Sequence, residues 1–300
     1  MKFQKQQQLC PVCGSEGFDV VLSPWAEEAD PAQLYGAASG MPGTQQLVKC
    51  LACGMIYENP RYDANVIIQG YTASQEAEHD SQYPMRVRSF FKTLQKHMGK
   101  IPSKGSKVLD IGTAGGAFLD AAKQFGYNAY GMEPSADLVK RGRARGLQVE
   151  QGTIEKHNFL PGSFDMVCLW DVIEHLPDPK SALIEIRKLL KPNGILLVNF
   201  PDIGTLQARL AGKRFWWLLS VHLHHFTRKS MADIFKRTGF EAFHFQRYWQ
   251  ILEFGYLEKM AARYKIPFAE LIANLTPGSI QRIPIPYYAS QTTALARISK

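Results

Sequence analysis

Four cysteines near the start of the chain form two Cys-x-x-Cys pairs, Cys10/Cys13 and Cys50/Cys53, and a glycine follows each pair. Four thiolates suit tetrahedral zinc, and a glycine at each knuckle lets backbone N–H groups turn toward sulfur. The 36 residues between the pairs exceed the usual ribbon spacing. Metal is still favoured over disulfides, because five cysteines is an odd number and nothing marks export. Four sulfur ligands leave no open position, so we predict a structural zinc site.

A glycine-rich segment follows a short apolar run, in Val108-Leu-Asp-Ile-Gly-Thr-Ala-Gly-Gly-Ala-Phe-Leu. Gly112, Gly115 and Gly116 would let backbone N–H groups face a ligand with no Cβ in the way. A dinucleotide fingerprint needs glycine at positions 114 and 117, where this chain has alanine, so nicotinamide and flavin are disfavoured. Asp110 would repel a pyrophosphate, which favours a ligand carrying positive charge. The alternative is an ordinary strand-to-helix turn.

A second acid, Glu133, ends the next predicted strand in Tyr130-Gly-Met-Glu-Pro-Ser, 23 positions after Asp110. A carboxylate at this position of a doubly wound sheet can accept hydrogen bonds from both hydroxyls of a ribose. A glutamate at a strand end can equally cap a helix or remain a surface charge. Its position relative to the glycine turn favours the ribose interpretation.

Histidines provide the candidates for acid–base chemistry, since the imidazole pKa lies near neutrality. His175 follows a predicted strand in Glu174-His175, and the alternative for this pair is to cap or pack the proline-rich turn that comes next. His222, His224 and His225 could form a metal cluster. With no carboxylate beside them in the sequence, we favour the wall of a lid or a place in the core.

Short apolar runs alternate with helical periodicity through the middle of the chain, a pattern typical of βαβ units. It predicts strands at 107–111, 129–132, 148–150, 165–170, 195–200, 241–249 and 291–298, and helices at 85–100, 117–125, 136–145, 180–190 and 228–238. We therefore expect a doubly wound α/β fold with a mostly parallel sheet. Ligands of such sheets bind beyond the carboxyl ends of the strands, where Asp110 and Glu133 fall.

These motifs together resemble one family. Asp110-Ile-Gly-Thr-Ala-Gly-Gly, Glu133-Pro-Ser, Ser163-Phe-Asp-Met-Val and Asp171-Val-Ile-Glu-His-Leu-Pro-Asp-Pro are similar in order and spacing to class I S-adenosylmethionine-dependent methyltransferases. The branch that the chain resembles includes ubiquinone-type O-methyltransferases and enzymes of glycan and natural-product pathways. The resemblance implies a Rossmann-like seven-stranded sheet preceded by a small zinc-ribbon-like module. Ala114 replaces the middle glycine of the family's motif.

The resemblance also implies roles for individual residues. Gly112, Gly115 and Gly116, with Asp110, would border the methionine end of S-adenosylmethionine, and Glu133 would hold its ribose. Thr153 and Ile154 would flank the adenine, although the usual aspartate is missing there. Asp171 would face the amino-acid or sulfonium end. His175 is the first candidate for a catalytic base and His225 the second.

We predict three regions: a zinc module at 1–60, a helical linker or lid at 61–105, and a methyltransferase domain at 106–300. The last would contain an aromatic lid at about 203–227 and a helical insert at about 251–290. The expected reaction is O- or C-methylation of a small-molecule, glycan or lipid-linked acceptor. An RNA methyltransferase and a non-catalytic cofactor-binding scaffold are the alternatives.

The net charge of +8 bears on possible partners. Residues 1–60 carry three basic and six acidic side chains, so the cysteine module itself is acidic, which disfavours nucleic acid as its ligand. Arg88, Lys92, Lys96 and Lys100 form a cationic row that could stay solvated or meet an anionic substrate or membrane surface. We find no transmembrane segment or signal peptide and expect a cytoplasmic protein. The oligomeric state is left open.

Overall fold

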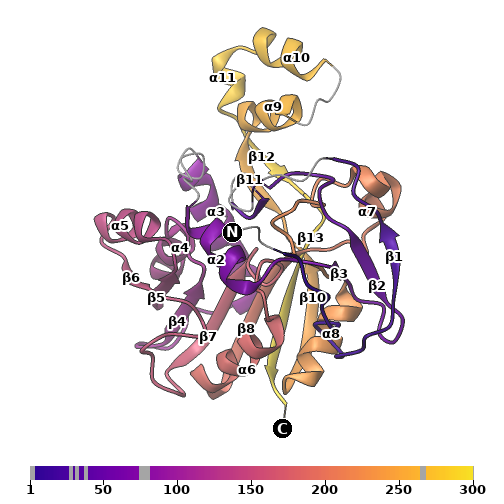
Figure 1. The fold of residues 1–300 in the computed structure, drawn as a ribbon. Coiled ribbons are helices and arrows are strands. Elements are labelled where there is room, and N and C mark those ends of the chain that lie inside the picture. The colour runs from indigo at the N-terminus through magenta and orange to yellow at the C-terminus, as the bar shows by residue number, and fades with distance from the viewer. Residues whose placement is uncertain are drawn as a thin grey trace.

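The computed structural model describes residues 4–26, 30, 34–36, 40–73, 82–263 and 268–299. Its centre is a seven-stranded sheet in the order β10-β13-β8-β7-β4-β5-β6 (Figure 1). Five strands run parallel, whereas β13 pairs antiparallel with both β8 and β10. The strands are β4 (Lys107–Ile111), β5 (Asn128–Glu133), β6 (Gln148–Gln151), β7 (Phe164–Trp170), β8 (Leu190–Pro201), β10 (Phe240–Arg247) and β13 (Gln291–Ile298). The predicted doubly wound, mostly parallel α/β fold is confirmed.

Helices cover both faces of this sheet: α3 (Tyr83–Met98), α4 (Ala117–Phe125), α5 (Ala136–Ala144), α6 (Pro179–Leu189) and α8 (Arg228–Arg237). Local sequence explains where they begin. Asp178 caps α6 by accepting a hydrogen bond from Ser181 N, and Thr227 and Ser230 form a capping box at α8. Apolar clusters lie on each side of the central strands, one with Ile186 and Phe235 and the other with Phe118 and Trp170.

The cysteine region forms a second sheet in the order β1-β2-β3-β9, from β1 (Phe18–Leu22), β2 (Leu47–Cys50), β3 (Ile56–Glu58) and β9 (His224–His225). The last strand comes from the predicted lid and pairs with β3 at Ile56↔His225 and Tyr57↔His224. The lid region also contains α7 (Leu206–Ala211) and η2 (Gly212–Arg214). Helix α2 (Ala64–Ala73) lies in the predicted linker, of which residues 74–81 fall outside the described part. The division into three regions stays a prediction.

The strand predicted at 241–249 ends two residues earlier in the structure, and the next strand along the chain belongs to another sheet. Strand β10 ends at Arg247, and β11 (Gln250–Glu253) pairs instead with β12 (Pro284–Tyr287). Tyr248 marks the change, because its backbone N–H donates to Gln291 and its side chain is buried under the main sheet. Beyond β11 come α9 (Phe254–Arg263), α10 (Ala269–Leu275) and α11 (Gly278–Gln281). These helices form the predicted insert, apart from residues 264–267, which are not described.

Within the described residues, no helix is long and apolar enough to cross a membrane.

Candidate active site

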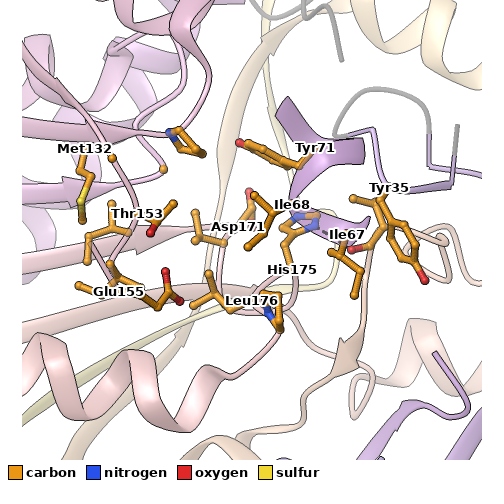
Figure 2. A pocket seen from close by; sticks show the side chains of 18 residues that line it. Tyr35, Ile67, Ile68, Tyr71, Met132, Thr153, Glu155, Asp171, His175 and Leu176 are labelled. Carbon is orange, nitrogen blue, oxygen red and sulfur yellow. Dashed lines mark hydrogen bonds between the residues drawn. The ribbon is translucent and has the colours of Figure 1, made fainter. Parts of the chain in front are cut away.

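Two adjoining cavities lie beyond the carboxyl ends of β4, β5 and β7. The first has an empty volume of about 790 Å³ and the second about 1740 Å³. Gly112, Asp171 and His175 line both, so the cavities meet at these residues. Figure 2 shows the first cavity, with Met132 and Thr153 on one side and Tyr71 of α2 on the other. This position is where ligands bind in open α/β sheets.

The glycine turn after β4 forms one wall of the second cavity. Gly112 has φ +67°, and a Cβ there would lie 2.7 Å from Val172 Cγ2. Gly116 has φ +86°, and its Cβ would lie 2.3 Å from Leu147 Cδ1, so glycine serves packing at that position. Gly112 and Gly115 line the second cavity with Ala114 between them, and Ala114 itself has φ +47°. The turn therefore brings backbone close to any ligand.

The two strand-end acids differ in their surroundings. Asp110 lines the second cavity, and its Oδ1 is buried without a hydrogen-bond partner among the described residues. Burial raises the pKa of Asp110 to about 8. Glu133 is fully buried and accepts hydrogen bonds from Ala114 N and Ser135 N, both at 3.0 Å. Among the residues that line the two cavities Glu133 is not found, so its ribose role stays a prediction.

Asp171 lies at the junction of the cavities in a strained conformation, with φ +55°. Asn199 Nδ2 and Gln291 Nε2 donate to its Oδ1 at 2.8 and 2.5 Å. Burial raises its pKa to about 6, while these amides and the positive charge of Arg86 favour the ionised form. Three elements distant in the sequence thus hold one carboxylate at the site.

His175 donates from Nδ1 to the Val221 carbonyl at 2.9 Å, which leaves the lone pair on Nε2. The His222 ring lies 4.8 Å from it, centroid to centroid, and donates from Nδ1 to Trp217 O at 2.8 Å. Burial lowers the pKa of His175 to about 4 and also lowers the pKa of His222, so both rings are neutral near pH 7.

Glu174 completes this cluster. A ligand atom of Glu174, one of His175 and one of His222 all lie within 4.8 Å of one another. The Glu174 carboxyl is buried, both its oxygens lack a hydrogen-bond partner among the described residues, and burial raises its pKa. The fold therefore brings the Glu174 carboxyl, which is next to His175 in the sequence, near His222 as well.

The other histidines of the segment belong to the interior. His225 is buried in β9 with burial lowering its pKa to about 4, and His224 Nε2 donates to Leu176 O at 2.9 Å. Among the residues that line the two cavities neither is found, whereas His222 lines the second. The expectation of a lid wall or core thus fits the described positions, and His225 as a base stays a prediction.

One charged residue of the second cavity was not singled out in the sequence. Arg86 is on α3, two positions before Arg88 of the cationic row, and its Nε is buried without a partner among the described residues. Trp216 and Trp217 line the second cavity and donate to the Ala289 carbonyl. Aromatic or apolar side chains complete it: Tyr71, Tyr83, Phe90, Trp170, Leu252, Tyr256, Met260 and Tyr287. The first cavity, by contrast, contains both predicted adenine neighbours, Thr153 and Ile154.

The four cysteine sulfurs gather at one point. Cys10 Sγ lies 3.5 Å from Cys53 Sγ, and Cys13 Sγ lies 3.5 Å from Cys50 Sγ, so no pair is a disulfide. All four lie within 4.8 Å of one another. Gly14 and Gly54 adopt positive φ and donate their N–H to the carbonyls of Cys10 and Cys50. The paired knuckles are compatible with a four-thiolate zinc module.

Comparisons with known proteins agree with this geometry. A family model described as a methyltransferase domain matches residues 79–244. Ubiquinone biosynthesis O-methyltransferases of Erwinia tasmaniensis and Methylococcus capsulatus are 33% and 34% identical over 97 and 102 residues. Those alignments cover 30% and 32% of this chain and 40% and 43% of the relatives, so the chain spans about two fifths of their length.

Solved structures share the fold at low identity. A Bacillus halodurans protein assigned as a methyltransferase matches with TM-score 0.51 and 18% identity, over 70% of this chain and 99% of that chain. The complex of the Haloferax volcanii Trm112 methyltransferase activator with its methyltransferase gives TM-score 0.52 and 15% identity, over 74% and 93%.

The chain therefore belongs to the methyltransferase domain family, and the resemblance to class I S-adenosylmethionine-dependent methyltransferases is confirmed.

Proposed function

We propose that this protein transfers a methyl group from S-adenosylmethionine to an oxygen or carbon of an apolar small-molecule, glycan or lipid-linked acceptor. The observation that carries the proposal is the pair of cavities joined at Gly112, Asp171 and His175. The smaller cavity is an apolar slot suited to a nucleoside, and the larger has room for a methionine moiety and an acceptor. A methyl group held where the two cavities meet would be accessible from the larger cavity while the cofactor occupied the smaller one.

The residues present fit the cofactor. Met132, Ile154 and Leu176 offer apolar contacts to an adenine in the first cavity. At the methionine end, the unpartnered oxygen of buried Asp110 would be satisfied by an ammonium group, and the Arg86 guanidinium is suited to a carboxylate. Glu133 would share its carboxylate between the backbone N–H groups of Ala114 and Ser135 and the ribose.

When bound, S-adenosylmethionine supplies a methyl group already activated by its sulfonium. The protein therefore has to align the acceptor, exclude water and accept a proton where the acceptor is a hydroxyl. The aromatic walls of the second cavity, including Trp216 and Trp217, would exclude water. His175, neutral and with Nε2 unprotonated, is the group placed to accept the proton.

Calorimetry tests the cofactor assignment. S-adenosylmethionine and its demethylated product should bind with about micromolar affinity. Glu133→Ala should weaken binding about tenfold or more, because hydrogen bonds to a charged group contribute roughly 1.5–3 kcal/mol. Asp137→Asn is the matched control, since Asp137 is a solvent-exposed acid on α5 paired with Arg141. Unchanged affinity in Glu133→Ala would refute its ribose role.

The acceptor class requires a separate experiment. Methyl transfer from labelled S-adenosylmethionine to fractionated cell extract should label a small or lipid-extractable product. Label that disappears after ribonuclease treatment would favour the RNA methyltransferase instead. Cofactor binding without transfer to any fraction would favour the scaffold alternative.

We also propose one structural zinc ion held by Cys10, Cys13, Cys50 and Cys53, supported by the convergence of the four sulfurs. Protein purified without chelator should contain about one equivalent of zinc, and its removal should unfold the module. Less than half an equivalent would contradict the proposal. A second equivalent that is lost in His175→Ala would assign the Glu174 cluster to a metal ion and not to a base.

A further inference from the structure

The helical insert carries an apolar surface that the methyltransferase fold does not use. Strands β11 and β12 form a two-stranded stalk, paired from Gln250↔Tyr287 to Glu253↔Pro284. The stalk holds α9, α10 and α11 away from the seven-stranded sheet, and Figure 1 shows them projecting at the end opposite the C-terminus. An element so placed adds no core to the main domain.

We define the insert face as the exposed apolar side chains of α10 and the residues after it. Phe268, Leu271 and Leu275 are 76%, 56% and 72% exposed, and Ile272, Ile280 and Ile283 are also exposed. Positions 268, 271, 272 and 275 have the i, i+3, i+4, i+7 spacing of a single helix face. An exposed apolar face on a helix commonly marks a surface that binds another protein or a membrane.

The inner side of α10 is already occupied. Ala269 is buried, α10 packs against α9, and the Thr276 hydroxyl donates to the buried carboxylate of Glu258. The helix therefore has a packed side within the insert and an apolar outer side. The insert face is accordingly a second surface, separate from the contacts that hold the insert together.

The insert carries more positive than negative charge. Residues 254–283 contain four basic and two acidic side chains; of the acids, Glu258 is buried and Glu270 is exposed on α10. Lys259 and Arg282 are exposed. The row Arg88, Lys92, Lys96 and Lys100 is also exposed, on the helix that contacts the stalk through Ser89 Oγ and Ile251 N at 2.7 Å.

The other end of the insert reaches the second cavity. Leu252 of the stalk, Tyr256 and Met260 of α9, and Tyr287 of β12 line it. One compact element thus presents an apolar surface to the outside and apolar side chains to the chamber. The insert would therefore connect an apolar molecule in the second cavity with an apolar surface outside the protein.

We propose that the insert face docks the protein on an anionic lipid bilayer. Apolar side chains flanked by exposed cations match an interfacial segment that buries carbon among acyl chains and leaves Lys and Arg at anionic headgroups. A second copy of the chain fits less well, because symmetric pairing of this face would bring Lys259 and Arg282 toward their own copies. Docking is independent of the proposed function and is measured without cofactor or acceptor.

Vesicle flotation of the full chain tests the proposal. The protein should float with phosphatidylcholine vesicles containing about 30% phosphatidylglycerol, and binding should fall at high salt. The double variant Leu271→Asp/Leu275→Asp should lose at least about tenfold in vesicle affinity. Leu206→Asp/Leu210→Asp is the matched control, because these α7 side chains are somewhat more exposed than Leu271 and Leu275, at 69% and 80%, and lie outside the insert. The control should bind vesicles as the wild type does.

Folding and oligomeric state are measured on the same samples. Both double variants should retain the thermal midpoint and the affinity for the demethylated cofactor, since none of the four residues lines a cavity among those described. Failure of the wild type to float, or equal flotation of the insert variant, would overturn the proposal. It would also be overturned by a dimer in light scattering that Leu271→Asp/Leu275→Asp converts to monomer, because that result identifies a second copy as the occupant.

Discussion

At the scale of single residues, Ala114 replaces the middle glycine of the family motif, and we expect this replacement to cost little stability. The position has φ +47°, a conformation that costs a non-glycine residue roughly 1–2 kcal/mol. Ala114→Gly should remove that strain. It should also lower the stability by roughly 0.4–1 kcal/mol, because glycine gives the unfolded chain more conformational entropy. We therefore expect the free energy of unfolding to rise by between zero and about 1.6 kcal/mol, with cofactor affinity retained.

Chemical denaturation and calorimetry measure both quantities. Gly112→Ala is the matched comparison, because its Cβ would lie 2.7 Å from Val172 Cγ2 and its φ is also positive. That variant should lose both stability and affinity. A loss of stability in Ala114→Gly would show that the alanine methyl contributes packing that outweighs the strain.

His175 is the residue on which the catalytic proposal depends. His175→Ala should lower turnover about a hundredfold or more while nearly preserving cofactor affinity, since general-base contributions are typically ~10² to 10⁴. Because burial lowers the pKa of His175 to about 4, the loss of turnover that belongs to His175 should begin only near pH 4 and be absent from the variant. A free histidine would instead give a limb near pH 6.5.

His244→Ala provides the control for His175, because His244 is an exposed histidine on β10. The thermal midpoint separates lost chemistry from lost folding. A well-folded His175→Ala variant with full turnover would remove the base from the mechanism and leave alignment alone, as an amine or thiol acceptor would allow.

At the scale of elements, the cysteine region and the catalytic cluster are connected by one buried side chain. Gln45 Nε2 donates to Ser220 O and His222 O at 2.8 and 3.1 Å, and to Glu58 Oε2 at 3.3 Å. Leu223 and His224 also donate their N–H to Glu174 O. The acceptor-side wall is therefore assembled from the module, the lid and the turn after β7.

Gln45→Leu should lower the free energy of unfolding by roughly 1–3 kcal/mol, because buried carbonyls lose their donor. It should lower turnover more than it lowers affinity for the demethylated cofactor, since His222, whose carbonyl accepts from Gln45, lines the second cavity and not the first. Gln46→Leu is the control, because Gln46 Nε2 donates to Asn59 O within the module. Equal effects of the two variants on turnover would show that Gln45 stabilises the module without positioning the wall.

At the scale of the whole molecule, two sets of buried groups oppose each other in their response to pH. Burial lowers the pKa of histidines, so their contribution to stability is present above about pH 6.5 and is lost as pH falls toward 4. Burial raises the pKa of acids, so their contribution is present at low pH and is lost as pH rises through the raised value. The lowered histidines are His97, His175, His222, His224 and His225, and the raised acids are Glu58, Asp110, Asp171 and Glu174.

We expect these slopes to offset one another, so that the free energy of unfolding changes little between pH 4.5 and 6. His225→Asn should change this pH dependence, because it removes one of the buried histidines. Below pH 6.5 the wild type should lose about 1.4 kcal/mol per pH unit relative to the variant, the value for one proton. Parallel curves from urea denaturation at each pH would show that His225 does not titrate on unfolding.

The sequence alone was sufficient for the strands of the seven-stranded sheet, for the helices that flank it and for motif residues near them in the chain. Strands 107–111 and 291–298 and helix 117–125 have the predicted limits, because periodicity and glycine stops act locally. The cysteine pairs and the strand-end acids were likewise visible, since parallel strands bring their carboxyl ends to a common edge. Only the tertiary structure placed Glu174 beside His222, Arg86 at the second cavity and Gln45 beside His222. Those contacts join residues from 48 to 177 positions apart, and no local pattern encodes packing between such distant segments.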